Sequence, residues 1–225
     1  MTRLMLLPSP LLGPAVWQSV AEELRARGWA VSVAALPERT ASPEDVLAGF
    51  LASVPDEPGV ALVPHSNAGR YVAAIAGRRE VKATVFVDAS PPEPETTPMA
   101  GPELLDHLQT LVGTDGLLPP WTEWWPPEEM AGLFPTEAAR ARIEEEQPHL
   151  PLAYFRSALP GPSRWDGRAA YLAFGDGYGG ERAAAVERGW PVRTLPGGHL
   201  HMLVDPDAVA SALAGLLGEL GIGPG

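Results

Sequence analysis

The sequence predicts an α/β fold: a doubly wound, mostly parallel sheet of about six strands with helices on both faces. Short apolar runs that suit strands alternate with segments of helical periodicity along most of the chain. Most of these runs are apolar at consecutive positions, which is typical of strands buried on both faces. Strands that are separated by helices are joined by right-handed crossovers, and they therefore lie parallel in one sheet. In such a sheet, functional sites lie at the carboxyl ends of the strands.

The expected elements follow one another in a regular order. In the first expected helix, Val16, Val20 and Leu24 recur at helical spacing before a glycine that ends it. The second helix begins with Ser42 as its expected N-cap, and proline follows at the first helical position. The six strands are expected at residues 3–8, 30–37, 59–66, 83–90, 169–175 and 191–197. Helices are expected at residues 15–28, 42–54, 67–79, 181–189 and 205–221.

Residues 91–165 interrupt this order with a proline-rich, acidic stretch and two segments of helical pattern. The first stretch, residues 91–103, is expected to be an irregular linker. Between the helical segments lie three tryptophans: Trp121, Trp124 and Trp125. A short insertion with few core residues is more typical of a lid over a site than of a separate domain. We therefore expect one domain over residues 1–225, although the tryptophans could also serve only to anchor a loop.

Composition and charge exclude several classes of function. The 225 residues, 45% of them hydrophobic, suffice for one sizeable core. They include no cysteine, which rules out disulfides, thiolate nucleophiles and cysteine-based metal sites. The net charge of −12 argues against nucleic acid and anionic membranes as partners. The apolar start is broken by Pro8 and Pro10, and no stretch is long enough to cross a membrane, so we expect a cytoplasmic protein.

A serine lies at a sharp corner between an expected strand and an expected helix. A nucleophilic serine needs an exposed hydroxyl, small neighbours that permit the tight turn, and a following backbone N–H aimed at the developing oxyanion. The nucleophile elbow, G-x-S-x-G, supplies all three. Here Pro64 and Ala68 replace the two glycines around Ser66, and the strand before and the small-residue helix after have the expected context. The competing interpretation is that Ser66 only caps the helix.

A histidine near the C-terminus is the candidate general base. His199 follows a glycine pair after the last expected strand and precedes the last expected helix, and His201 is the second candidate. The order of serine first and histidine last is the one that a strand-to-helix elbow of this kind uses. Together the two motifs favour nucleophilic catalysis by Ser66.

On these residues the chain resembles the α/β-hydrolase superfamily, especially its small single-domain esterase-like members. The resemblance covers nearly the whole chain and rests on residues 6–31, on VPHSNAG at 63–69 and on LPGGHLHMLVDPDAVA at 195–210. In that superfamily a glycine-histidine pair followed by an apolar residue carries the base. The match to Gly198-His199-Leu200 favours His199 over His201.

The expected oxyanion hole departs from the pattern that this resemblance implies. The superfamily commonly has His-Gly after the first strand, and the next backbone N–H completes the hole. Those places are here occupied by Pro8 and Ser9, and the next residue, Pro10, has no N–H to donate. The second donor beside Asn67 N–H is then expected at Leu11 or at Leu12, or from the side chain of Ser9.

Two aspartates are candidates for the acid that orients the histidine. Asp176 follows the penultimate strand, which is the usual place for the acid according to the resemblance. Asp88 ends the strand after the elbow, a rarer place. We expect Asp176 to be the acid, with Asp88 as the alternative. Asp205 and Asp207 are expected to cap the final helix.

The resemblance and the motifs together imply a serine hydrolase that cleaves an ester or thioester of a small, largely apolar acyl substrate, with no cofactor. Ser66 would be the nucleophile, His199 the base and Asp176 the acid. Asn67 and Leu11 would hold the oxyanion, and the three tryptophans would line an acyl pocket. Two alternatives remain open: a cofactor-free lyase, cyclase or transacylase on the same fold, and a non-catalytic ligand-binding protein.

Overall fold

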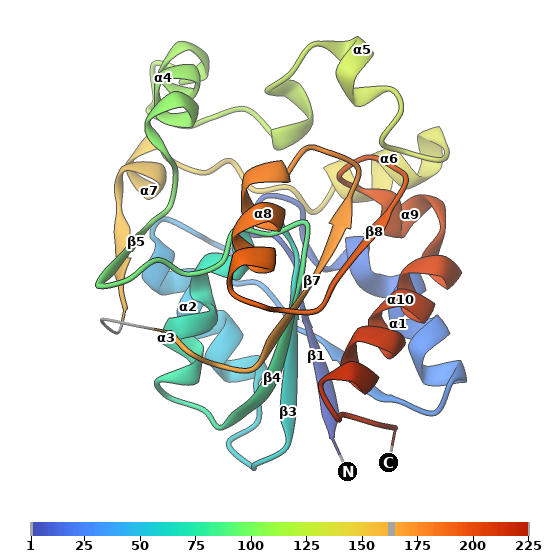
Figure 1. Cartoon of the computed structure of the whole chain (residues 1–225). Coiled ribbons are helices and arrows are strands. Elements are labelled where there is room, and N and C mark those ends of the chain that lie inside the picture. The colour runs from blue at the N-terminus through green and yellow to red at the C-terminus, as the bar shows by residue number, and fades with distance from the viewer. Residues whose placement is uncertain (1, 162–164, 225) are drawn as a thin grey trace.

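The computed structural model describes residues 2–161 and 165–224, and its centre is a parallel sheet of six strands in the order β2-β1-β3-β4-β7-β8 (Figure 1). The strands are β1 (Arg3–Leu7), β2 (Ala30–Val33), β3 (Val60–Pro64), β4 (Val81–Val87), β7 (Ala169–Phe174) and β8 (Val192–Leu195). Each strand overlaps one of the six apolar runs, and every neighbouring pair is parallel. The predicted fold class is therefore confirmed.

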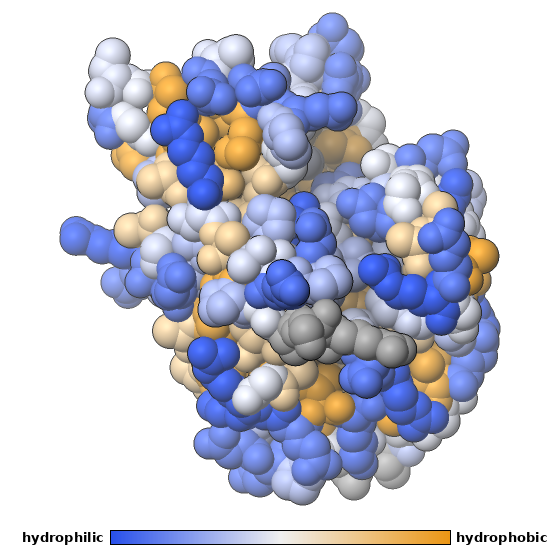
Figure 2. Space-filling view, turned by 60° about the vertical axis from the view of Figure 1, so that its left-hand side comes forward, coloured by the Kyte–Doolittle hydropathy of each residue, from blue (hydrophilic) through white to orange (hydrophobic). Residues whose placement is uncertain are grey.

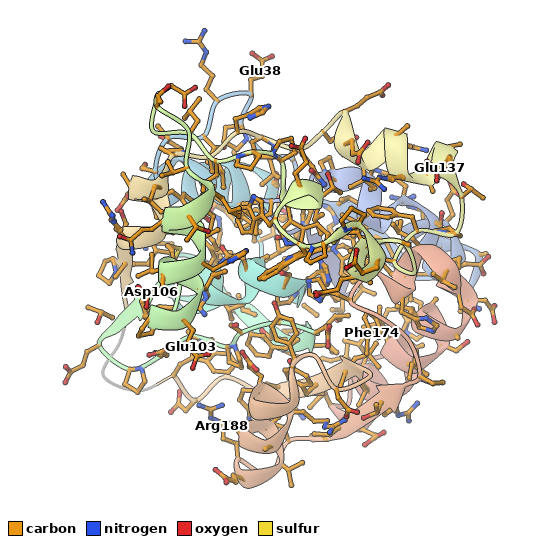
Figure 3. The ribbon with its side chains drawn as sticks, turned by 90° about the horizontal axis from the view of Figure 1, so that it is seen from above. Glu38, Glu103, Asp106, Glu137, Phe174 and Arg188 are labelled. Atoms are coloured by element: carbon orange, nitrogen blue, oxygen red, sulfur yellow. The ribbon has the colours of Figure 1, made fainter. Side chains whose placement is uncertain are left out.

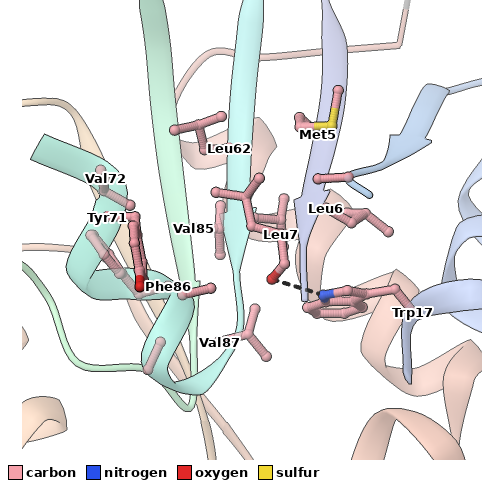
Figure 4. Packing of buried hydrophobic residues seen from close by; sticks show 14 of the residues in the cluster. Met5, Leu6, Leu7, Trp17, Leu62, Tyr71, Val72, Val85, Phe86 and Val87 are labelled. Carbon is pink, nitrogen blue, oxygen red and sulfur yellow. Dashed lines mark hydrogen bonds between the residues drawn. The ribbon is translucent and has the colours of Figure 1, made fainter. Parts of the chain in front are cut away.

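Burial along the strands explains why the apolar runs are continuous. All residues of β3 and β7 are buried, whereas the edge strands β2 and β8 are only partly covered. Figure 4 shows Leu6, Leu62 and Val85 packed among the central strands. Burial of each such side chain contributes about 1.5–3 kcal/mol to folding. Trp17 is also buried, and its indole N–H donates to the Leu7 carbonyl at 3.2 Å.

Helices cover both faces of the sheet (Figure 1). On one face α1 (Gln18–Ala26) packs against α10 (Pro206–Glu219), and the other face carries α2 (Pro43–Ser53), α3 (Val72–Ala76) and α8 (Gly179–Glu187). The short elements η1 (Pro14–Trp17), η2 (Ser66–Tyr71) and α9 (His201–Val204) complete this part of the chain. None of the helices in the described ranges is long and apolar enough to cross a bilayer.

The expected helix caps can be followed in the structure. Ser42 caps α2 with a capping box, in which its hydroxyl accepts from Asp45 N–H and the Asp45 carboxylate accepts from Ser42 N–H. Asp205 caps α10 by accepting from Ala208 N–H at 2.9 Å. Asp207, the other expected cap, instead pairs with the Arg27 guanidinium.

The insertion between β4 and β7 lies over the carboxyl ends of the strands, at the opposite end of the molecule from both termini (Figure 1). We call this insertion the cap. Its elements are β5 (Thr96–Pro98), α4 (Pro102–Leu111), η3 (Trp121–Glu123), α5 (Pro127–Met130), α6 (Glu137–Glu144), α7 (Leu152–Arg156) and β6 (Ala158–Pro160). Residues 162–164 of the predicted lid range fall outside the described residues.

One part of the linker prediction was wrong. Within residues 91–103, Thr96–Pro98 forms β5 and pairs antiparallel with β6. Prolines are tolerated here because the pair is short and has free edges. The two-stranded sheet holds the beginning and the end of the cap together, so the cap leaves the sheet and returns to it at one place.

Candidate functional site

Ser66 lies at a strained corner directly after β3. Its φ is 57°, a left-handed conformation that is uncommon for a residue with a side chain and costs of order 1–3 kcal/mol. Backbone hydrogen bonds hold the corner: His65 N–H donates to the Leu7 carbonyl, and Ala68 N–H donates to the His65 carbonyl. The Ser66 hydroxyl makes no capping hydrogen bond to η2, which argues against a merely capping serine.

Gly69, one residue after the second glycine position of the elbow motif, provides the close approach that the missing glycines would allow. A Cβ atom at Gly69 would lie 2.4 Å from the Ser90 carbonyl oxygen, so only glycine allows the first turn of η2 to approach the segment after β4 this closely. Ala68 fits without such a conflict and is fully buried. The departure from G-x-S-x-G therefore leaves the corner intact.

His199 and Asp88 form a hydrogen-bonded pair beside this corner. His199 lies between β8 and α9, and its Nδ1 is 2.7 Å from Asp88 Oδ2. Asp88 follows β4 with a φ of 43°, its side chain is 1% exposed, and its Oδ1 accepts from Phe174 N–H at 3.0 Å. A neutral His199 with its proton on Nδ1 would leave Nε2 free to accept a proton. The second candidate base, His201, lies instead against the Phe174 ring.

The structure does not bring Asp176 to His199, which corrects the expected pairing. The Asp176 side chain is 94% exposed and forms an ion pair with Arg182 at 3.1 Å. The cause is the turn after β7: Gly175 has a φ of 59°, and the chain leaves the sheet so that Asp176 faces solvent. The acid that contacts His199 is Asp88, the alternative from the sequence.

Two flat rings flank His199. The His65 ring lies 4.5 Å from it, and the Tyr178 ring stacks on it at 5.1 Å with an angle of 10° between the planes. His65 Nε2 is 3.0 Å from the His199 carbonyl, so Nε2 carries the proton because a carbonyl can only accept. Burial, and then the proximity of His199, lowers the pKa of His65 well below its usual 6.5, so His65 is neutral near pH 7.

The Ser66 hydroxyl contacts Tyr178 rather than His199. Ser66 Oγ lies 3.3 Å from the Tyr178 hydroxyl oxygen. The hydrogen bonds of the described residues include none between Ser66 and His199, although both side chains line the same cavity. Catalytic hydrogen bonds are often long before substrate binds and shorten in the complex.

The expected oxyanion donors can be located individually. Asn67 lines the cavity, and the hydrogen bonds of the described residues include none from its backbone N–H. Leu11 lines the cavity, but its N–H is 3.4 Å from Ser9 Oγ, a long contact. Leu12 N–H is engaged by the Ser9 carbonyl at 3.0 Å and is not free to donate elsewhere. The Ser9 side chain is fully buried and does not line the cavity.

The cavity at this site has a volume of about 930 Å³ and is walled largely by the cap. All three tryptophans that the sequence singles out line it. Trp121 is the one nearest His199, with 6.0 Å between ring centroids. Trp124 is 4% exposed and donates to the Pro119 carbonyl, and Trp125 stacks on His107 at 4.6 Å. These two tryptophans thus also anchor their loop, which was the second interpretation.

The charged groups of the cavity are mostly acidic. Glu103, Glu129 and Glu181 line it, together with one cation, Arg70. Arg70 is committed to the Pro98 carbonyl and to Ser90. Viewed from above, α4 with Glu103 and the end of β7 lie on opposite sides of the centre (Figure 3). Figure 2 shows apolar surface in the upper part of the molecule framed by hydrophilic residues.

A buried chain of hydrogen bonds joins the cap to the elbow. The Tyr154 hydroxyl, from α7, donates to Asn67 Oδ1 at 3.0 Å and also contacts the Tyr71 hydroxyl. Asn67 Nδ2 donates to the Met99 carbonyl at 3.1 Å. Asn67, whose N–H is the first expected oxyanion donor, is therefore held through its side chain by two points of the cap.

The sequence reasoning missed three residues of the site: His65, Tyr154 and Tyr178. His65 could have been found, since it directly precedes Ser66 and must lie near anything that Ser66 contacts. Tyr178 follows Asp176 by two residues in the same glycine-rich loop, but nothing in the pattern says which of the two faces inward. Tyr154 gives no local signal, because its role depends on how the cap folds back.

Comparison with known proteins supports the fold. No protein-family model and no curated protein matches the sequence. The structure is similar to an extracellular α/β-hydrolase from a Paenibacillus species, with a TM-score of 0.75 and 17% identity over 96% of this chain and 99% of that chain. It is similar to a variant of tomato methylketone synthase I, with a TM-score of 0.70 and 13% identity over 97% and 98%. It is also similar to the methylesterase MES16 from Arabidopsis, with a TM-score of 0.68 and 16% identity over 97% and 100%.

These proteins differ by name in the reactions they carry out, and each is too distant in sequence to transfer an activity. What they share with this chain is the fold, over 96–97% of its length. The strand order, the corner at Ser66 and the histidine after the last strand agree with that assignment. The chain has the α/β-hydrolase fold.

Proposed function

We propose that the protein is a serine hydrolase that cleaves an ester or thioester of a small, largely apolar substrate through an acyl-enzyme. The observation that carries this proposal is the meeting of a strained serine corner with a hydrogen-bonded histidine–aspartate pair at one cavity. In this proposal Ser66 is the nucleophile and His199 the base. Asp88 takes the role of the acid that the sequence assigned to Asp176.

The reaction follows from these positions. Ser66 Oγ attacks the acyl carbon and gives its proton to His199 Nε2, while Asp88 stabilises the resulting imidazolium through Nδ1–H. The carbonyl oxygen becomes an oxyanion that accepts from the N–H groups of Asn67 and Leu11. Collapse of this intermediate expels the alcohol or thiol, which takes its proton from His199. A water molecule, deprotonated by His199, then attacks the acyl-enzyme through the same steps, which releases the carboxylic acid and restores Ser66. The proposal requires no cofactor.

The cavity supports a substrate of moderate size and low polarity. A volume of about 930 Å³ lies in the usual range for small-molecule sites. Trp121 and the neighbouring apolar side chains suit an acyl chain or a ring. The carboxylates of Glu103 and Glu129 disfavour an anionic substrate, as does the net charge of −12. Neutral esters and thioesters are the substrates proposed.

One observation favours a second candidate, a cofactor-free lyase or cyclase with the same serine and histidine. The segment after β1 offers a poor second oxyanion donor, because Pro10 has no N–H and Leu12 N–H is engaged by the Ser9 carbonyl. A reaction without a tetrahedral oxyanion would not need that donor. The two candidates differ in whether an acyl-enzyme forms with a good ester.

The test is an intact-mass experiment with a fluorophosphonate, followed by a screen of p-nitrophenyl esters and acyl thioesters of increasing chain length. We expect one adduct per chain and turnover of short neutral esters, both lost in Ser66→Ala. Ser90→Ala is the matched control, because Ser90 also lines the cavity but donates to Glu181 at 3.1 Å. An adduct that survives in Ser66→Ala, or a folded wild type with neither adduct nor turnover, would refute the proposal.

A further inference from the structure

The backbone near Ser66 offers few N–H groups that could donate a hydrogen bond to the oxyanion of the proposed reaction. An elbow of this kind uses the N–H after the nucleophile and a second N–H from the segment after an earlier strand. In that segment Pro10 has no N–H, and the Ser9 carbonyl accepts from both Leu12 and Gly13. Leu11 N–H is drawn toward Ser9 Oγ. Loss of one donor typically lowers kcat about 10²–10³-fold, so a third group that donates would matter.

The Tyr178 hydroxyl is placed where such a donor is needed. It lies 3.3 Å from Ser66 Oγ, and the residue lines the cavity. The parallel stacking of its ring on His199, at 5.1 Å and 10°, fixes the direction in which the hydroxyl points. The loop after β7, where the sequence predicted the acid, thus delivers a phenol to the site instead of the Asp176 carboxylate.

The phenol keeps its proton over the working range of a serine hydrolase. Burial raises the pKa of Tyr178 to about 12, and the neighbouring carboxylates of Asp88 and Glu181 add to the shift. A neutral phenol has one O–H to donate. Between about pH 6 and 9 the group is therefore a hydrogen-bond donor and not a base, since a general base works best with a pKa near the operating pH.

We propose that the Tyr178 hydroxyl donates a hydrogen bond to the oxyanion formed from the acyl carbonyl, beside Asn67 N–H. This inference rests on the proposed function. As Ser66 Oγ bonds to the acyl carbon, its proton passes to His199 Nε2 and the carbonyl π pair moves onto oxygen. Tyr178 keeps its proton and moves its hydrogen bond from Ser66 Oγ to that oxygen. Both oxygens are bonded to the same carbon, so a group that contacts one is within reach of the other.

The test is Tyr178→Phe, which keeps the ring and its stacking on His199 and removes only the hydroxyl. We expect kcat for a p-nitrophenyl ester to fall about 10²-fold, the lower end of the range for one lost donor, with KM nearly unchanged. The affinity for a trifluoromethyl ketone, which forms a tetrahedral adduct with serine, should fall by the same factor. Asp176→Asn is the control, because it changes a side chain of the same loop that is exposed, pairs with Arg182 and does not line the cavity. It should leave kcat/KM close to that of the wild type.

Each other outcome has a definite meaning. If Tyr178→Phe keeps the kcat and the ketone affinity of the wild type, the hydroxyl does not serve the oxyanion and the inference is wrong. A rise in kcat would also overturn it, since Tyr178 would then only hold Ser66 in an unproductive contact. In both cases labelling and turnover by the wild type would leave the proposed function standing. A wild type that neither labels nor turns over any ester would instead remove the proposed function, and the role of Tyr178 with it.

Discussion

Replacement of Asp88 by asparagine tests the site geometry most directly, because it changes charge and hydrogen bonding but not shape. Asp88 has a φ of 43°, in a region that asparagine tolerates better than most residues. The carboxylate accepts two N–H groups, from His199 Nδ1 at 2.7 Å and from the Phe174 backbone at 3.0 Å. An asparagine in the same place has one oxygen and one NH₂ group, so only one of these donors keeps an acceptor.

The two N–H donors, on Phe174 and on His199, differ in whether they can adapt to the loss of an acceptor oxygen. Phe174 N–H belongs to the buried main chain and can only donate, whereas the imidazole of His199 can change its tautomer. We therefore expect the asparagine oxygen to face Phe174 and its NH₂ group to face His199. The histidine proton then moves to Nε2, which can no longer take the proton of Ser66. The equivalent change in a serine protease lowers kcat about 10⁴-fold. At about 1.36 kcal/mol per factor of ten, that is about 5.4 kcal/mol of transition-state stabilisation.

Asp176→Asn is the matched control, because it makes the same chemical change in the loop where the sequence predicted the acid. Its exposed carboxylate pairs with Arg182, so we expect kcat/KM close to that of the wild type. Both variants are assayed with one p-nitrophenyl ester at neutral pH, and urea unfolding checks that each is folded. A folded Asp88→Asn variant within about tenfold of the wild type would refute the tautomer argument, whose expected loss is far larger. An equal loss of kcat/KM in Asp176→Asn would support Asp176, the residue that the sequence favoured, as the acid.

Two further predictions concern residues around this pair. Tyr154→Phe removes the hydroxyl that donates to Asn67 Oδ1, and we expect the free energy of unfolding to fall by about 1–3 kcal/mol and kcat to fall at unchanged KM. If urea titrations show the loss of stability but kcat is unchanged, Tyr154 only holds the cap in place. His65 has a pKa well below 6.5 in the folded state and about 6.5 in the unfolded chain, so the unfolded state binds more protons below pH 6.5. The free energy of unfolding therefore decreases as pH falls below 6.5, by at most about 1.36 kcal/mol per pH unit. His65→Gln removes this titrating group, so urea unfolding should show the wild type losing stability faster than the variant between pH 7 and 5.5. Equal losses of stability in the two proteins would contradict a neutral His65.

The sheet could be predicted from the sequence because its strands carry their own signal. A run such as residues 60–63 is apolar at every position, and the same residues are buried on both faces in the structure. The α2 cap at Ser42 was equally local, since proline and aspartate follow it at the required spacing. The β5–β6 pair was missed for the opposite reason. Three-residue strands with a proline at one end have no period to detect, and only the return of the chain brings them together.

Of the site, the sequence could locate Ser66 and His199 because each follows a strand, and the carboxyl ends of parallel strands meet at one edge. The residues alone did not separate Asp88 from Asp176, since both follow strands, and the resemblance favoured Asp176, which does not contact His199. The choice depends on the turn after each strand. Gly175 turns the chain so that Asp176 faces solvent, whereas Asp88 itself adopts a positive φ that its surroundings impose. Glycine signals such a turn in a sequence, but a strained aspartate does not.

The cap is tied to the corner at Ser66 by more than its covalent ends. Asn67 lines the cavity, and its side chain binds Met99 at the beginning of the cap and Tyr154 near its end. Any motion that separates these two points from the sheet would release Asn67 and weaken the oxyanion site. If the cap acts as a lid, the motion must therefore occur between these points, in the stretch that carries Trp121 and the other tryptophans. A motion confined to that stretch would leave Asn67 held by Met99 and Tyr154.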